Sequence, residues 1–294
     1  MKIDDKNLND DLTQGLRRLN TIAKIMRAKR IQSGALTLSS NEIRFNLDSE
    51  TNDPIDVMTK ELKETNSMVE EFMLLANITV AKKIYETFPQ FACLRRHPEP
   101  PASNFDPLIK AAESKDIAMK CDSGKSLADS LDQAHDPANP FFNTMLRMLT
   151  TRCMMQALYF CSGLFPEAEF KHYGLAASIY THFTSPIRRY ADIIVHRLLA
   201  VSIQADSTYP QLLDKQYLQQ ACNNMNYRHK MAQYAGRASV DLHTQLFFRN
   251  RQVDEEAYIL SIKKNALNVL IPKYGLEGAL HLKDFSFVYD EQVS

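Results

Sequence analysis

The residues best suited to chemistry lie in one stretch of the chain, which reads His-Phe-Thr-Ser-Pro-Ile-Arg-Arg-Tyr-Ala-Asp at its centre. Ser185 is a favourable N-cap residue and Pro186 suits the first helical position, so we expect a helix to begin here. Arg188 would then stand in the first turn, beside free backbone N–H groups and the positive end of the helix dipole. A guanidinium in that place is a good receptor for phosphate. The stretch therefore predicts an anion site.

The spacing of side chains along this expected helix predicts two faces. One face is apolar and buried, formed by Ile187, Tyr190, Ile194 and Leu198. On the second face Arg188, Asp192 and His196 follow at intervals of four and should form a row of charges. An ordinary amphipathic helix with internal ion pairs is the structural alternative. The adjacent Arg188 and Arg189 oppose the helix dipole, however, and this pairing favours a bound anion.

Composition restricts the class of protein. The chain has 294 residues, of which 45% are apolar and 24% charged, and this is typical of a globular protein with a large core or two domains. The formal net charge is zero, so binding to nucleic acid must rest on a local surface. Five cysteines without a CxxC pair indicate reduced thiols. With neither a membrane span nor a signal peptide, the sequence predicts a soluble intracellular protein.

The periodicity of apolar residues predicts a helix-rich α+β fold. We expect helices over residues 8–32, 60–88, 107–119, 124–134, 140–160 and 210–250, the last broken once. Alternating segments predict paired strands at 35–38 and 42–47 and a β-meander at 257–262, 266–271 and beyond the turn at 272–278. Proline content predicts an extended connector over residues 94–107, with a basic knot at Arg95-Arg96-His97.

Three polar features leave alternatives open. Glu70 and Glu71 interrupt an apolar helical segment, so either one points inward to a cation or donor, or both lie on the wet face. The basic side chains of the first helix form either a solvated face or a nucleic-acid surface. The segment from Asn226 to Lys230, together with Arg237, could line a polar groove, although a solvated face is the more economical interpretation.

The stretch Tyr180–Leu199 resembles the signature of the RNase II / RNase R (RNB) exoribonucleases. Similar segments lie in the first helix and at 34–40, 66–77 and 271–278, and they are most like the exosome-type members of that family. The resemblance implies that residues 1–251 are the carboxy-terminal portion of an RNB catalytic domain. Residues 252–294 would be the first strands of an S1-type OB β-barrel.

The family's properties become expectations for this chain. The resemblance implies a processive, Mg²⁺-dependent 3′→5′ hydrolysis of single-stranded RNA to nucleoside monophosphates. It implies single-stranded RNA and the exosome core subunits as partners and no membrane. It also implies a location in the nucleus, including the nucleolus, and in the cytoplasm.

The resemblance assigns roles to particular residues. Arg188 matches the arginine that contacts the reacting phosphate, and Glu70 matches a glutamate facing the catalytic pocket. The residues matched to RNA binding are Tyr180, His182, Ser185, Arg189 and Arg197. Two family features are missing, because a base-stacking aromatic aligns with Leu38 and an acidic pocket residue aligns near Gly236.

A further departure concerns the metal. The DxxxxxDxDD pattern that holds the metals in the family is absent from these residues, and neither Asp4-Asp5 nor Asp10-Asp11 matches it. We therefore expect no metal ligands here, Mg²⁺ bound upstream, and a fragment that is inactive alone. The alternative is a catalytically inactive RNA-binding or exosome-assembly protein that has lost the metal site.

Overall fold

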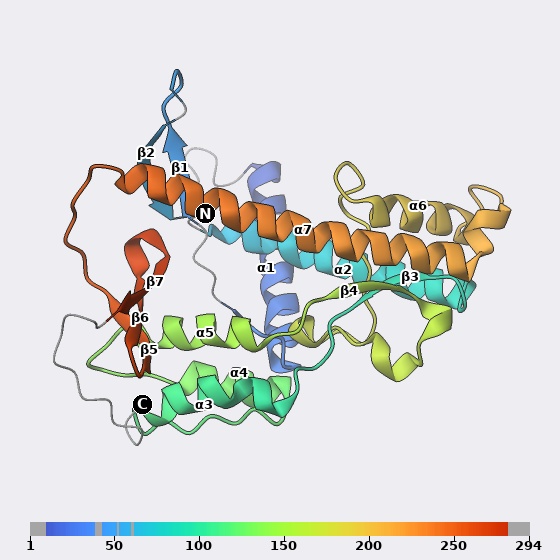
Figure 1. The fold of residues 1–294 in the computed structure, drawn as a ribbon. Helices are drawn as coiled ribbons and strands as arrows, with labels where there is room; N and C mark the ends of the chain where they lie inside the picture. Colours follow the sequence, from blue (N-terminus) through green and yellow to red (C-terminus); the bar gives the residue numbers. More distant parts are fainter. Residues whose placement is uncertain (1–9, 39–42, 52, 60–61, 282–294) are drawn as a thin grey trace.

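A single long helix, α7, crosses most of the width of the molecule in Figure 1. The computed structural model describes residues 10–38, 43–51, 53–59 and 62–281. The helices are α1 (Asp11–Gln32), α2 (Glu64–Thr87), α3 (Asp106–Glu113), α4 (Gly124–Gln133), α5 (Phe142–Cys153), α6 (Tyr190–Ser202) and α7 (Lys215–Phe248). The strands are β1 (Ile43–Leu47), β2 (Pro54–Thr59), β3 (Cys93–Arg96), β4 (Leu158–Cys161), β5 (Tyr258–Lys263), β6 (Ala266–Ile271) and β7 (Leu276–His281).

Among the described residues, the buried apolar side chains form two clusters. One joins α2, the β3–β4 pair, α6 and the first turns of α7, and its centre includes the fully buried Ile84, Val195 and Leu198. The other joins α3, α4 and α5 around Phe105, Leu131 and Leu146. The strands β5, β6 and β7 follow as an antiparallel meander, which confirms the expected order of strands. The fold is therefore the expected helix-rich α+β type.

Several predicted elements need correction because distant segments pair with them. Strand β3 pairs antiparallel with β4, with Cys93 opposite Cys161, so Arg95 and Arg96 lie in a strand rather than in a connector. The same pairing draws residues 158–161 away from the predicted 140–160 helix, which ends at Cys153. Strand pairing is a tertiary property, and helical periodicity does not report it.

Two further expectations fail. Residues 35–38 form no strand, and β1 pairs with β2 instead, while residues 39–42 lie outside the described part of the chain. Helix α7 runs unbroken over 34 residues, starting where the Asp214 side chain accepts the N–H groups of Gln216 and Tyr217. It contains no proline, and Gly236 has helical geometry, so nothing in the segment forces a break.

No helix in the described ranges is long and apolar enough to cross a membrane.

The open question about the glutamate pair is settled by burial. Glu71 is buried against α1, where Arg30 donates to it through Nη2 (Nη2–Oε1 2.6 Å) and through Nε (Nε–Oε1 3.2 Å). Glu70 is exposed on the adjacent part of α2. A buried carboxylate needs such a partner, because without one the cost of dehydration is not offset. The Arg30–Glu71 pair thus fixes α1 to α2.

Removal of the buried carboxylate should therefore be costly. We expect Glu71→Ala to lower the free energy of unfolding by about 3 kcal/mol, because Arg30 would be left partly buried without its partner. The neighbouring variant Glu70→Ala is the matched control and should change it by less than about 0.5 kcal/mol. Urea unfolding followed by circular dichroism measures both. Equal losses in the two variants would contradict this account.

Candidate nucleic-acid interface

The segment before α6 is a turn held by a buried carboxylate. The backbone N–H of Ser185 donates to Asp192 Oδ1 (2.7 Å), and the Ser185 carbonyl accepts the N–H groups of Arg188 and Arg189 (3.2 Å each). The helix begins at Tyr190, with Arg189 as its N-cap. The prediction that Ser185 caps the helix and that Pro186 opens it is therefore wrong. Capture of the Ser185 N–H by Asp192 closes a separate turn before the helix starts.

The charges also pair differently from the expected row. Asp192 is fully buried and accepts two hydrogen bonds of 2.7 Å from the Arg189 guanidinium, whereas His196 is hydrogen-bonded to the Phe183 carbonyl. Arg188 is exposed, and its guanidinium has no ion-pair partner in the part of the chain that the structure describes. Arg188, Asp192 and His196 therefore do not form the expected row, and within the described ranges Arg188 is left without an ion-pair partner.

The expected apolar face of this helix is only half present. Ile194 and Leu198 are buried in the core between α2 and α7, as predicted. Ile187 is 95% exposed and Tyr190 is 48% exposed, so neither belongs to a buried face. Ile187 lies in the turn before the helix, where helical spacing no longer determines its direction.

Behind the turn lies a cluster of rings. The ring centroids of His172 and Tyr180 are 5.1 Å apart, those of Tyr180 and His182 5.5 Å, and those of His182 and Tyr159 5.6 Å. The Tyr159 hydroxyl is hydrogen-bonded to His182 Nδ1 (2.5 Å). From α2, the Asn77 amide donates to the Tyr180 hydroxyl (3.0 Å) and accepts the Phe183 N–H (2.9 Å). Asn77 thus joins α2 to the segment that presents the arginines.

Burial and positive charge keep this cluster neutral. Burial, assisted by Arg95 and Arg189, lowers the pKa of His182 to about 2. Burial lowers the pKa of His172 to about 3, with further effects from His97 and Arg95. Burial raises the pKa of Tyr159 to about 12, although the Arg95 guanidinium, 4.6 Å from the Tyr159 ring centroid, opposes this. The rings therefore carry no charge at neutral pH, and the guanidiniums provide the site's positive potential.

The structure separates the remaining predicted residues from this cluster. Arg197 donates to the Tyr209 hydroxyl (3.3 Å) and lines a different cavity, with Phe91. Glu70 has no hydrogen bond or ion pair in the described part of the chain. It lies seven residues before Asn77 and so on the same face of α2. The other predicted site residues lie together in the turn and the ring cluster: Tyr180, His182, Ser185, Arg188 and Arg189.

Sequence reasoning missed four members of the site. Asn77 was detectable as a polar residue at the end of an apolar helical run, where its burial requires partners. Arg95 was noticed only as part of a presumed connector. Nothing local distinguishes Tyr159 or His172, because Tyr159 contacts His182, 23 residues away, and the His172 ring meets that of His97, which directly follows strand β3.

The donor set of this site does not fit a divalent metal. Guanidiniums, neutral imidazoles and phenols surround the turn, whereas Mg²⁺ prefers carboxylate and other oxygen ligands. The single carboxylate, Asp192, is occupied by Ser185 and Arg189. Within the described ranges no group of three or more His, Cys, Asp or Glu residues could hold a metal. The arrangement can bind and orient a phosphate, and any metal chemistry must come from other residues.

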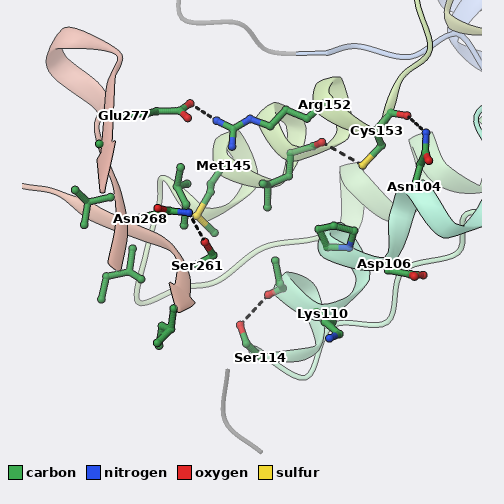
Figure 2. Close-up of a pocket in the computed structure, with 18 residues that line it drawn as sticks. Asn104, Asp106, Lys110, Ser114, Met145, Arg152, Cys153, Ser261, Asn268 and Glu277 are labelled. Carbon is green, nitrogen blue, oxygen red and sulfur yellow. Dashed lines mark hydrogen bonds and ion pairs between the residues drawn. The ribbon is translucent and has the colours of Figure 1, made fainter. Parts of the chain in front are cut away.

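A separate cavity of about 880 Å³ lies between α3 and α5 on one side and the meander on the other (Figure 2). An ion pair between Arg152 and Glu277 joins the two sides, and Asn268 donates to the Ser261 hydroxyl (2.9 Å) at its rim. None of the predicted site residues lines this cavity. Its position marks the junction of the helical part and the meander.

The fold is similar to that of a solved structure. The structure of Mycoplasma genitalium RNase R in complex with ribose-methylated single-stranded RNA matches with a TM-score of 0.81 and 24% identity. The match covers 97% of this chain and 45% of that chain. A family model described as "RNB domain" matches residues 2–205, and a model described as "S1 domain" matches residues 253–293. The chain belongs to the RNB domain family, as the resemblance predicted.

Two relatives match nearly the whole chain. The "Exosome complex exonuclease RRP44" of Homo sapiens is 62% identical over 299 residues, covering 100% of this chain and 31% of the relative. The "Exosome complex exonuclease dis3" of Schizosaccharomyces pombe is 53% identical over 293 residues, covering 99% of this chain and 30% of the relative. The chain thus spans about a third of the length of these relatives.

The neutral histidines predict a pH dependence of stability. In the unfolded chain His172 and His182 titrate near 6.5, well above their folded pKa values of about 3 and about 2. Below about pH 6.5 the unfolded state binds protons that the folded state does not, so stability falls as pH falls. Between pH 7.5 and 5.5 we expect a loss of about 1–2 kcal/mol in the free energy of unfolding, allowing for their partial exposure.

Urea unfolding at several pH values measures this slope. The double variant His172→Gln/His182→Gln should flatten it, whereas His135→Gln, which changes an exposed histidine, should leave it unchanged. An unaltered slope in the double variant would show that other groups cause the pH dependence.

Proposed function

We propose that this chain is the carboxy-terminal part of an RNB nuclease domain and the beginning of an S1 domain in a longer 3′→5′ exoribonuclease. The parent enzyme hydrolyses single-stranded RNA to nucleoside monophosphates. The observation that carries the proposal is Arg188, an exposed guanidinium without an ion-pair partner in the described ranges, presented beside Arg189 and His182 in the family's signature segment. Mg²⁺ is held by carboxylates outside these residues.

Each residue of the site has a distinct task in this proposal. Arg188 binds the scissile phosphate and stabilises the charge that develops on it in the transition state. Arg189 is committed to Asp192 and keeps the turn closed. Tyr180 and His182 support the turn from behind and add no net charge. His182 does not serve as a general base near neutral pH, because its pKa is about 2.

The names of the relatives support the partners that we propose for the parent protein. Both curated relatives carry the name exosome complex exonuclease, which supports the exosome core subunits as partners of the parent protein. The solved RNase R complex contains single-stranded RNA, which supports the same class of ligand here. We extend the proposal to a location in the nucleus, including the nucleolus, and in the cytoplasm.

The catalytic role of Arg188 can be tested in a chimaera. In it this chain replaces the equivalent part of the human relative, to which it is 62% identical. Arg188→Ala should lower kcat/KM on a 3′-tailed single-stranded RNA by about 10²–10³-fold, as expected when one transition-state donor is removed. Arg249→Ala, just beyond the far end of α7, is the control and should lose less than about twofold. A loss of only a few-fold in Arg188→Ala, with the fold intact, would overturn the assignment.

The unfused chain should behave differently from the chimaera. It lacks a suitable donor set for Mg²⁺ in its described ranges, so we expect the purified chain to bind single-stranded RNA weakly and to hydrolyse none of it. Gel analysis of labelled RNA with and without Mg²⁺ measures this. Degradation that depends on Mg²⁺ would contradict the placement of the metal ligands. The coding sequence upstream of Met1 separates the enzyme from an inactive RNA-binding protein, since only the former retains DxxxxxDxDD.

A further inference from the structure

Helix α7 is anchored at both ends and open in the middle. At its start Cys222 is buried, and the Asn226 side chain accepts the Tyr159 N–H (2.8 Å) and donates to the Tyr159 carbonyl (2.9 Å). At its end Thr244 and Phe247 are buried. Between these anchors every residue from 227 to 240 is exposed except the half-buried Met231. We call residues 227–240 the bridge segment, and it lies in the middle of the long helix in Figure 1.

The composition of the bridge segment is unusual for an exposed helix. From Lys215 to Val240 there is no aspartate or glutamate, so its cations have no carboxylate neighbours along the helix. The segment carries Arg228, Lys230 and Arg237 and, before Val240, no Leu, Ile, Val or Phe. Tyrosine and arginine are common at protein interfaces as well, so the charge of the segment, and not its lack of aliphatic side chains, is what selects the class of ligand. Uncompensated cations favour a polyanion.

Aromatic and basic side chains alternate along one stripe of this segment. Tyr227, Lys230, Tyr234 and Arg237 follow at i, i+3, i+7 and i+10 and therefore share one face. The two tyrosines are 58% and 49% exposed. Seven residues of helix separate them by about 10.5 Å along the axis, roughly the length of three nucleotides stacked at 3.4 Å. Lys230 Nζ lies 5.7 Å from the Tyr234 ring centroid, so cation and ring are adjacent.

The stripe begins beside the site already described. Asn226, directly before Tyr227, is the residue that holds the backbone of Tyr159. His229, on the same turn, is close enough to Arg95 that this charge, after the effect of burial, helps to lower its pKa. A strand on the stripe could therefore continue toward Arg95 and the ring cluster without crossing an acidic surface of α7.

We propose that the bridge segment is a second RNA contact, on which bases of a single strand stack against Tyr227 and Tyr234 while Lys230 and Arg237 pair with its phosphates. Alternating rings and cations are the means by which proteins hold single strands without reading their sequence. The inference rests on the proposed function, because the same strand would reach Arg188. It adds a contact that none of the predicted site residues supplies.

Fluorescence anisotropy of the chain with a labelled 12-nucleotide oligo(A) tests the proposal. Tyr227→Ala/Tyr234→Ala should weaken binding about tenfold or more, whereas Tyr227→Phe/Tyr234→Phe should stay within about twofold, because stacking needs only the ring. Lys230→Gln should reduce the slope of log K against log salt by about one. Tyr217→Ala changes an equally exposed tyrosine of α7 outside the bridge segment and is the matched control.

The outcomes separate the two proposals. If Arg188→Ala weakens binding and the tyrosine variants do not, the stacking inference fails and the proposed function survives. If the unaltered chain does not bind the oligonucleotide at all, both the stacking inference and the RNA-binding part of the proposed function fail. Polyphosphate, which has charge but no bases, is the second probe. If Tyr227→Ala/Tyr234→Ala weakened the binding of polyphosphate and of oligo(A) equally, the stacking inference would also be overturned. Only the affinity for RNA should depend on the rings, because polyphosphate has no bases.

Ultraviolet cross-linking gives a direct readout that does not depend on affinity. Nucleotide adducts mapped by mass spectrometry to peptides containing Tyr227 or Tyr234 support the contact. Adducts confined to the peptide with Arg188 and Arg189 overturn it. Circular dichroism of every variant shows whether the helix content is retained.

Discussion

The arrangement of the site depends on the burial of one carboxylate. Asp192 has no access to solvent, so its charge must be neutralised and both of its oxygens must accept hydrogen bonds. Arg189 satisfies this requirement from three residues away, and the Ser185 N–H adds the third hydrogen bond. The chain is thereby forced into a turn before α6. The adjacent Arg188 does not share this acceptor and faces solvent, which is the property that a phosphate receptor needs.

The ring cluster provides a rigid and uncharged support for that arrangement. An ionised histidine or tyrosine beside Arg95 and Arg189 would alter the local potential, but burial keeps both kinds of side chain neutral. Asn77 connects this support to α2 through two hydrogen bonds. Arg95 and Arg189 consequently lie near rings that neither compete with them for an anion nor repel them as further cations would.

Features governed by local rules were predictable from the sequence, and features governed by distant partners were not. The periodicity of Leu127 and Leu131 sufficed for α4, and the alternation in residues 266–271 sufficed for β6. The start of α6 was misplaced because capping preferences favoured Ser185 while Asp192, seven residues later, captured its N–H. Periodicity placed the start of the predicted 140–160 helix close to the start of α5 at Phe142. It placed the end too late, because the pairing of β3 with β4 is not visible in helical periodicity.

In the candidate site, too, some features were predictable from the sequence and others depended on distant partners. The family resemblance assigned Arg188 and Arg189 to one site. The structure shows that they differ, because Arg189 is paired with Asp192 whereas Arg188 faces solvent. The choice between Glu70 and Glu71 depended on the position of Arg30, 41 residues from Glu71 in sequence, so no local pattern contained it. Arg197 lies in the signature segment but on another side of α6, which shows that a motif can include residues from more than one surface.

The open middle of α7 has a thermodynamic consequence. There the helix is stabilised mainly by its own backbone hydrogen bonds. At Gly236 an added Cβ would meet no atom within 4 Å apart from its chain neighbours and the adjacent helix backbone, so glycine gains nothing from packing there and weakens the helix by about 1 kcal/mol relative to alanine. Such a segment opens locally at a lower free energy than its anchored ends. Any ligand held there would also order the backbone, so its binding would be coupled to the local folding of the helix. Affinity at this surface is then set partly by how well the empty helix is formed.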